Sequence, residues 1–473
     1  MSFVSYEFFV LFGALLALYF IASHRLQNRL LLLASYIFYG WWDWRFLILL
    51  FASSSMDYLW GFVLDKEHYP SLSPQRRKTA LILSVICNLG ILGFFKYFNF
   101  FVESFVDLSQ KLHLHVDLPL LKIVLPIGIS FYTFQSMSYT IDIYRGELRS
   151  TKNYLDFLTF VSFFPHLVAG PIQRASNLLP QVIKPRNLTL ENFYSGTQLA
   201  FYGFFLKMVI ADNAATVVNA TFHQSTPSSP AVILAIYAFA IQIYCDFCGY
   251  TNIAIGISRM IGFNLTLNFN LPYFATDPSD FWRRWHISLS SWLRDYLYIS
   301  LGGNRKGEYR TYLNLFITML LGGLWHGAAW HFVLWGFFHG LLLFIYRLLQ
   351  TDSAVQSPEQ SRLRFWLSVI FYFQLTCIGW FLFRVENMAQ LGTLWHAVTT
   401  NLTFAGFSAP DLVKILLLWV PVLSLELYQF YQKDLEPWVK WPVFLRIPFY
   451  LVMFYAIVLF GTPEKNEFIY FQF

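Results

Sequence analysis

The chain of 473 residues is 56% hydrophobic and 20% aromatic, and only 13% of its residues are charged. Because soluble globular proteins carry roughly 25% charged residues, this composition excludes a water-soluble fold and indicates an integral membrane protein. The formal net charge of +6 is typical of cytoplasmic loops enriched in Lys and Arg, and it does not imply nucleic acid binding.

Apolar runs long enough to cross a bilayer, about 17–25 residues each, recur along the whole chain with short polar breaks. We count thirteen candidate spans, give or take about two, at residues 6–22, 30–44, 46–64, 79–101, 121–144, 154–169, 193–210, 231–248, 311–327, 330–349, 363–383, 412–428 and 447–460. The sequence therefore predicts an all-α, polytopic membrane protein with a single transmembrane domain over residues 1–473.

Charged residues in the first half of the chain predict its orientation. Basic residues gather in the alternate connections 24–29, 66–78 and 145–152, whereas the connection 102–120 between them is mainly acidic. By the positive-inside rule, the basic connections are cytoplasmic and the N-terminus lies outside.

The connection 279–310 differs from the others because it reads as an amphipathic helix. Its large apolar residues recur every three or four positions, at Trp282, Trp285, Leu289, Trp292 and Tyr296, and polar residues fill the rest of the circumference. We expect Ser279 or Asp280 to cap the start of this helix, and the glycines 302–303 with Asn304 to end it. Such a helix is expected in the membrane interface or at the mouth of a cavity.

Three histidines, His326, His331 and His339, lie in the otherwise apolar segment "GGLWHGAAWHFVLWGFFHG". Their spacings turn about 140° and about 80° around a helix, so no two form the i, i+4 pair that holds one metal ion. No Asp, Glu or Cys lies in the segment, and we predict no metal. We interpret His331 and His339 as structural residues bonded to neighbouring backbone.

His326 differs from the other two in its neighbours. Gly322, Gly323 and Gly327 remove side chains around it, which allows other helices or a substrate to reach the imidazole, and Trp325 adds an aromatic wall. A histidine in an apolar bundle is suited to accept a proton. Its leading functional interpretation is a general base, and the alternative is a satisfied core histidine.

Other polar residues in apolar segments have structural interpretations. Asp142 and Asp246 are expected to form structural ion pairs, with Lys207 and Arg259 as possible partners, or to lie at helix ends. The four cysteines are too scattered for a disulfide framework or a zinc site, and we expect them in the core: Cys87, Cys245, Cys248 and Cys377.

The segment "FWRRWHISLSSWLRDYLYISLGGNR", together with the histidine segment, resembles the signature region of the membrane-bound O-acyltransferase superfamily. Within it, the chain is similar to the bacterial branch with the membrane proteins of alginate and peptidoglycan O-acetylation and, more distantly, of teichoic acid D-alanylation. The resemblance extends in order through "LLLLASYIFYGWW", "LPIGISFYTFQSMSYTIDIYRGE", "FFPHLVAGPIQR", "YCDFCGYTNIAIGISRMIGF", "NFNLPY" and "EFIYFQF", and so covers nearly the full chain.

The resemblance implies a helical fold around a central tunnel or funnel, with a histidine at its narrowest point. It assigns catalysis to His326, as the base that deprotonates an acceptor hydroxyl, and to His286, which would orient a thioester or stabilise charge on its oxygen. It places substrate-binding residues in the same region, namely Trp285, Trp325, Arg283, Arg294, Asp295 and Asn304. The cations Arg283, Arg284, Arg294, Arg305 and Lys306 would favour an anionic donor such as coenzyme A.

These implications predict a multi-pass O-acyltransferase of the bacterial cytoplasmic (inner) membrane. It would take acetyl from acetyl-CoA, with no tightly bound cofactor, and pass it outward for O-acetylation of a cell-envelope polysaccharide such as alginate or peptidoglycan. A periplasmic O-acetyltransferase partner would complete the transfer, and the remaining contacts would be with membrane lipid. The competing hypothesis is a transporter or flippase of an acylated carrier, in which Asp142, Asp246 and Lys207 would contact the coupling ion or substrate.

Overall fold

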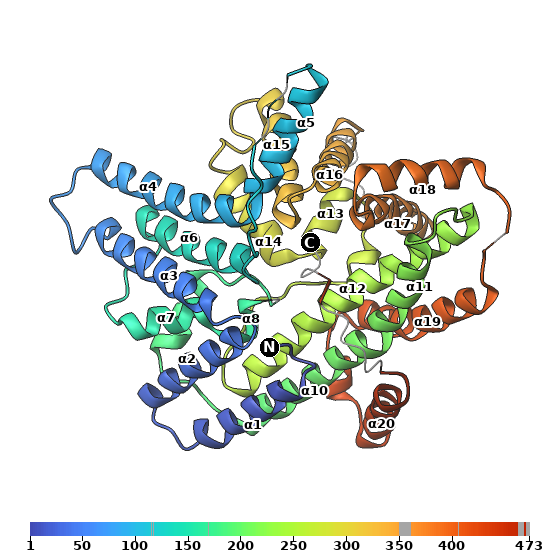
Figure 1. Ribbon diagram of the computed structural model, residues 1–473. Coiled ribbons are helices and arrows are strands. Elements are labelled where there is room, and N and C mark those ends of the chain that lie inside the picture. Colours follow the sequence, from blue (N-terminus) through green and yellow to red (C-terminus); the bar gives the residue numbers. More distant parts are fainter. Residues whose placement is uncertain are drawn as a thin grey trace. The chain divides into compact units, whose positions relative to one another are not determined.

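The computed structural model describes residues 1–114, 116, 118–168, 170–349, 361–404, 406–461 and 468–469. Every regular element in these ranges is a helix (Figure 1), which confirms the all-α prediction. The chain divides into two compact units: Met1–Thr197 with Ile253–Thr266, and Gln198–Asn252 with Leu267–Phe473. The single domain expected over residues 1–473 and the central tunnel or funnel both stay predictions.

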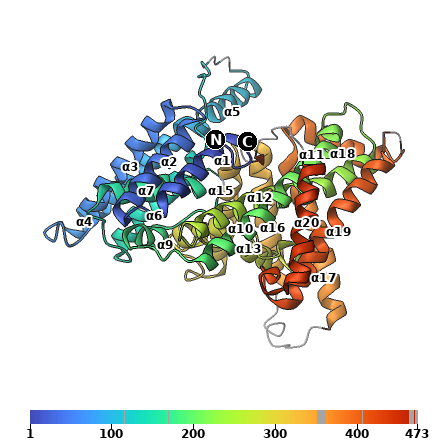
Figure 2. The same ribbon diagram turned by 90° about the horizontal axis from the view of Figure 1, so that it is seen from below.

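The first unit consists of α1 (Tyr6–Tyr19), α2 (His24–Gly40), α3 (Arg45–Leu64), α4 (Pro74–Leu92), η1 (Gly93–Tyr97), α5 (Phe98–Lys111), α6 (Ile129–Arg145), α7 (Tyr154–Ser162), α8 (Phe164–Leu167) and α9 (Ala175–Ile183). Two further helices, α10 (Leu190–Phe205) and α12 (Ser229–Met260), contribute residues to both units. Figures 1 and 2 show them side by side. Their backbones approach at Gly196, where a Cβ would lie 2.5 Å from the carbonyl oxygen of Gly256.

The second unit continues with η2 (Leu206–Ala211), α11 (Asp212–Phe222), η3 (Pro272–Phe274), α13 (Pro278–Arg284), α14 (Ile287–Trp292), η4 (Leu293–Tyr298), α15 (Glu308–His326), α16 (Trp330–Leu349), α17 (Arg362–Arg384), α18 (Met388–Thr400), α19 (Ala409–Gln432), η6 (Pro437–Lys440) and α20 (Val443–Phe460).

Three of the four cysteines are buried and Cys87 is half-buried, and all four are free thiols.

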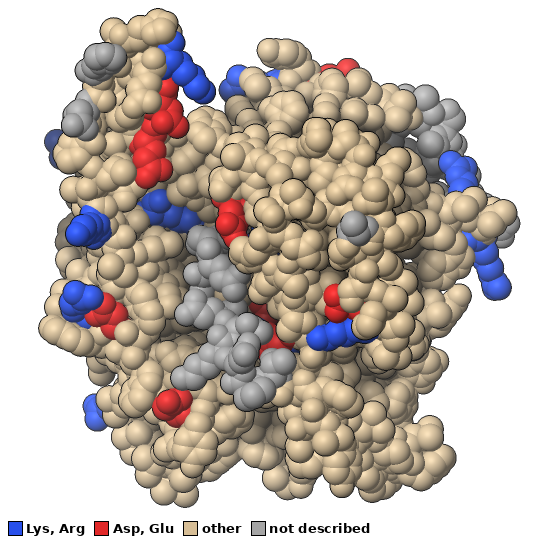
Figure 3. Space-filling model, turned by 45° about the vertical axis from the view of Figure 1, so that its right-hand side comes forward, with Lys and Arg blue, Asp and Glu red and all other residues tan. Residues whose placement is uncertain are grey.

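Seven of the thirteen predicted spans lie in helices that are long and apolar enough to cross a membrane, within the described ranges. These helices cover Arg45–Leu64, Pro74–Lys111, Leu190–Phe222, Ser229–Met260, Trp330–Leu349, Arg362–Arg384 and Val443–Phe460. The other predicted segments are helical over most of their described residues, but their helices fall short of that combination of length and apolar character. Charged side chains are sparse on the face shown in Figure 3, as expected of a surface in contact with lipid.

Helix α6 shows why one predicted span was too long. The sequence predicted a span at 121–144, but the helix begins only at Ile129, directly after Gly128, whose φ of +76° lies in the left-handed region. A Cβ at Gly128 would lie 2.5 Å from the carbonyl oxygen of Leu167, so only glycine fits there. Proline at 126 further disfavours a helical conformation at the residue before it.

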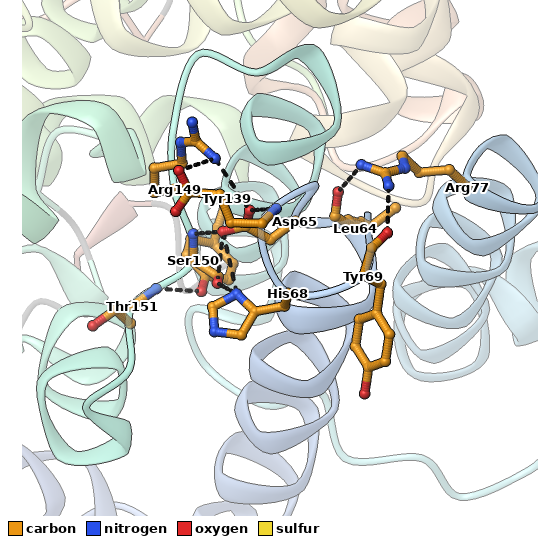
Figure 4. A network of polar contacts seen from close by, with 10 residues as sticks. Leu64, Asp65, His68, Tyr69, Arg77, Tyr139, Arg149, Ser150 and Thr151 are labelled. Atoms are coloured by element: carbon orange, nitrogen blue, oxygen red, sulfur yellow. Dashed lines mark hydrogen bonds and ion pairs between the residues drawn. The ribbon is translucent and has the colours of Figure 1, made fainter. Parts of the chain in front are cut away.

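A polar network joins two of the basic connections in the first unit (Figure 4). The carboxylate of Asp65, at the end of α3, accepts hydrogen bonds from the backbone N–H and the hydroxyl of Ser150, each at 2.8 Å. Arg149 forms an ion pair of 2.9 Å with Glu67 and lies 3.6 Å from Asp65. The connections 66–78 and 145–152 therefore lie on the same side of the unit, as the charge pattern predicted.

Candidate active site

His326 is the last residue of α15, and its side chain is buried, with 4% relative exposure. Its imidazole meets the rings of Trp335 and Phe383 edge-on, at centroid distances of 5.0 and 5.2 Å. Trp325 lies on another side at 5.1 Å, which agrees with the predicted aromatic wall. The histidine therefore sits in an aromatic enclosure built from α15, α16 and α17.

The glycines around His326 allow close helix packing. A Cβ at Gly323 would lie 2.2 Å from the carbonyl oxygen of Phe332, and one at Gly327 would lie 2.1 Å from the ring of the same residue. The sequence left open whether the glycines allow another helix or a substrate to come close, and these two glycines allow another helix. They seat α16 directly against α15 and thereby fix the backbone that carries the imidazole.

His286 lies between α13 and α14 and is fully buried, with 0% exposure. The sequence predicted one continuous helix across this point, and that prediction was wrong. His286 has φ +44° and ψ +52°, a left-handed conformation that is unfavourable for residues with a Cβ and that breaks the helix. The predicted cap was also wrong, because Asp277 accepts the hydrogen bond from the backbone N–H of Asp280. The apolar stripe is nevertheless buried at Trp285, Leu289, Trp292 and Tyr296.

Asn268 holds this break in place. Its backbone carbonyl accepts from Ile287 N–H at 2.9 Å, and its side-chain Oδ1 accepts from the backbone N–H and the hydroxyl of Ser288, at 3.3 and 2.8 Å. The same Oδ1 lies 3.1 Å from Nδ1 of His286. Because an amide oxygen only accepts hydrogen bonds, Nδ1 must carry the proton, and Nε2 carries the lone pair. Burial lowers the pKa of His286 to about 3, which is consistent with this neutral form.

The two imidazoles predicted as catalytic are brought together. The ring centroids of His286 and His326 are 6.4 Å apart, and Trp325 lies beside both, at 5.8 Å from His286. The neutral Nε2 of His286 is an acceptor, so it favours hydrogen bonding to a hydroxyl over donation to an oxyanion. A buried pair of imidazoles can bind and deprotonate a polar group.

The predicted substrate-binding residues are placed differently from one another. Trp285 is a core residue with 1% exposure, and its ring packs 4.6 Å from that of Trp380. Arg283 is exposed and lies 3.4 Å from Asp280. Arg294 is also exposed and pairs with its neighbour Asp295 at 2.6 Å. Asn304 is exposed in the turn after η4, together with Arg305 and Lys306.

The remaining candidate histidines are buried, but the backbone hydrogen bonds expected for them are not found among the described residues. The ring of His331 lies 4.1 Å from that of Phe332, and neither of its nitrogens has a hydrogen-bond partner there. His339 is buried between Trp282 and Trp335, and its Nδ1 likewise has none. Lys207 forms ion pairs with Asp212 at 2.6 Å and Asp246 at 2.7 Å, so Asp246 pairs with one of the two possible partners that the sequence offered. Asp142 is buried in the first unit.

Sequence reasoning missed three residues that shape the site. Asn268 belongs to the quoted segment "NFNLPY", but nothing in that segment alone pairs it with a histidine 18 residues away. Trp335 and Phe383 form the enclosure of His326 from α16 and α17, and a single apolar residue in a membrane helix carries no signal of its own. The aromatic content of these helices was the available hint.

A family model and several named proteins match this chain. The family model described as MBOAT, the membrane-bound O-acyltransferase family, matches residues 144–382, just over half of the chain, and this range includes His286 and His326. A probable alginate O-acetylase of Azotobacter vinelandii is 42% identical over 92% of this chain and 87% of its own length.

Two further relatives carry other names. A peptidoglycan O-acetyltransferase of Helicobacter pylori is 37% identical over 78% of this chain and 74% of its own length. A teichoic acid D-alanyltransferase of Bacillus subtilis is 28% identical over 54% of this chain and 68% of its own length. The extent and identity of these matches are sufficient to assign the family. The chain belongs to the membrane-bound O-acyltransferase family and is a multi-pass membrane O-acyltransferase.

Proposed function

We propose that this protein takes an acetyl group from acetyl-CoA at the cytoplasmic face of the inner membrane and passes it outward for O-acetylation of a cell-envelope polysaccharide. The single observation that carries the proposal is the buried pair His286 and His326, 6.4 Å apart within the region that matches the family. The names of the relatives, which include alginate and peptidoglycan acetylating proteins, support acetyl as the group and a polysaccharide as the acceptor.

In this proposal His326 is the general base. It removes the proton from an acceptor hydroxyl while the hydroxyl oxygen attacks the thioester carbonyl. The C–O bond forms, the C–S bond breaks, and the proton passes from the imidazolium to the departing thiolate, which leaves as free coenzyme A. The apolar rings of Trp325, Trp335 and Phe383 exclude water, which disfavours hydrolysis of the thioester.

His286 would act as a hydrogen-bond acceptor just before this step. Its Nε2 lone pair can accept the O–H of the incoming acceptor and so hold the hydroxyl beside His326. The single O–H then turns to His326, which removes the proton as the oxygen attacks. This assignment differs from the one that the resemblance implied, because a neutral imidazole protonated at Nδ1 has no Nε2 proton to give to the thioester oxygen. Stabilisation of the developing oxyanion would then come from other groups.

The exposed cations at Arg283, Arg294, Arg305 and Lys306 would attract the phosphates of coenzyme A. Arg283 and Arg294 already lie close to carboxylates, so donor binding would exchange one anionic partner for another. A periplasmic O-acetyltransferase would then complete delivery to the sugar hydroxyl.

The test is thioester turnover by the purified protein in detergent, with acetyl-CoA and with or without an extract of the cell envelope. An acetyltransferase releases free coenzyme A in at least one of these conditions, and His326→Gln abolishes most of the release. A transporter or flippase of an acylated carrier would release none in any condition. The paired charges around Lys207 fit a structural ion cluster and give transport no separate support.

A further inference from the structure

We infer that Asn268 is a positioning residue for acyl transfer, which acts by fixing the tautomer and orientation of His286. The inference rests on the proposed role of His286 and extends it to a residue outside the two histidine segments. Asn268 is fully buried, with 0% exposure, and it lies on the connection between α12 and η3.

The first argument is the direction of the hydrogen bonds. Three donors meet at Oδ1 of Asn268, namely Nδ1–H of His286 and the backbone N–H and hydroxyl of Ser288. Because two of them belong to Ser288 and the backbone N–H can only donate, the amide oxygen cannot be exchanged with the amide nitrogen at this place. On the other side, Nδ2 donates to the hydroxyl of Thr251 on α12 at 3.4 Å. The orientation of the amide is thus determined by its surroundings.

The second argument is the conformation of His286. A left-handed residue with a Cβ is maintained only where its surroundings impose it, and such strain concentrates at functional sites. Asn268 imposes it twice, through its backbone carbonyl to Ile287 and through its side chain to His286 itself. The ring of Phe247 packs edge-on against His286 at 4.7 Å and completes the support.

The consequence is chemical. With Nδ1 protonated, the lone pair at Nε2 is available to a hydroxyl, and with the opposite tautomer it is not. Loss of the acceptor at position 268 would let the proton move between the two nitrogens and the ring rotate. Transfer would slow although donor binding is unchanged.

The experiment measures kcat and the acetyl-CoA KM for Asn268→Ala, Asn268→Leu and Asn268→Asp, for His286→Ala, and for the double variant Asn268→Ala with His286→Ala. Asp keeps an oxygen acceptor for all three donors, and Leu keeps the side-chain volume if the Ala variant does not accumulate. The matched control is Asn314→Ala, because Asn314 is equally buried but bonds to the backbone of Gly303 at 2.9 Å.

We expect Asn268→Ala or Asn268→Leu to lower kcat on the order of 10²-fold with little change in KM, and Asn268→Asp to recover most of that loss. The double variant should be no slower than His286→Ala, whereas the loss in Asn314→Ala should multiply with that of His286→Ala. The inference would be overturned if the losses of Asn268→Ala and His286→Ala multiply in the double variant, or if Asn268→Asp is as slow as Asn268→Ala. Wild-type activity in His286→Ala alone would instead overturn the proposed role of His286.

Discussion

Replacement of His326 by glutamine separates chemistry from packing. The imidazole is buried and touches the rings of Trp325, Trp335 and Phe383, so truncation to alanine would leave a cavity. Truncation of a large buried side chain commonly costs about 2–5 kcal/mol of stability. Glycines flank the histidine in the sequence, but Gly323 and Gly327 face α16 and do not empty the space around the ring. Glutamine fills much of the volume and retains polar atoms, but it is no base.

If His326 is the base, His326→Gln should lower acetyl transfer by roughly 10² to 10⁴, which corresponds to about 2.7–5.4 kcal/mol in the activation free energy. Its melting temperature in detergent should stay close to that of the wild type, whereas that of His326→Ala should fall. The assay is polysaccharide O-acetylation in cells that lack the wild-type protein, at matched amounts in the membrane. His331→Gln is the control, with stability affected more than transfer. Near wild-type acetylation by His326→Gln would refute the reasoning.

Three further predictions concern single positions. His286→Asn should retain more transfer activity than His286→Ala, because asparagine adopts the left-handed conformation more readily and keeps a polar side chain; equal losses at equal protein amounts would argue against this. Gly323→Ala should lower the melting temperature and slow transfer, because its Cβ would lie 2.2 Å from a backbone oxygen. Gly322→Ala should have a mild effect, because its Cβ meets only a side-chain carbon at 3.3 Å. Similar melting temperatures for the two variants would contradict the packing argument. Asp65→Asn should destabilise the protein at pH 7 and make its stability depend less on pH in the acid range. Burial opposes the charge of the Asp65 carboxylate, but hydrogen bonds from Glu67 and Ser150 outweigh the effect of burial and lower the pKa of Asp65. The contribution of the Asp65 carboxylate to the stability of the protein is therefore complete above its unfolded pKa of about 3.9 and is lost as the pH falls further. If the melting temperatures of the wild type and of Asp65→Asn differ by the same amount from pH 7 to pH 3, the prediction is wrong.

The sequence predicted those parts of the fold that depend on composition and periodicity. The apolar runs located the seven helices of the described ranges that are long and apolar enough to span a membrane. The stripe through Trp285, Leu289, Trp292 and Tyr296 identified the buried face after α13. The break at His286 was not predictable in the same way. Helical periodicity survives a break of one residue, because the stripe continues on the far side, and a left-handed histidine depends on tertiary hydrogen bonds from Asn268.

The same limit applies to the candidate site. Resemblance to the family singled out His286 and His326, and the structure places their rings side by side. The tautomer of His286 follows only from the amide that faces it, which lies 18 residues earlier in the chain. Likewise, the sequence offered Lys207 and Arg259 as possible partners of Asp246, and the structure was required to choose Lys207 and to show its second carboxylate, Asp212.

The most direct test of the proposed function uses inside-out membrane vesicles, whose outer surface is the cytoplasmic face. Acetyl-CoA radiolabelled in the acetyl group is added outside vesicles that contain the wild-type protein, or the His326→Gln variant, with envelope polysaccharide and periplasmic extract enclosed. We predict that wild-type vesicles release free coenzyme A outside and accumulate labelled O-acetyl polysaccharide inside, and that the variant does neither at a comparable rate. Label that enters the lumen while still attached to coenzyme A, or equal polysaccharide labelling by the two proteins, would contradict the proposal.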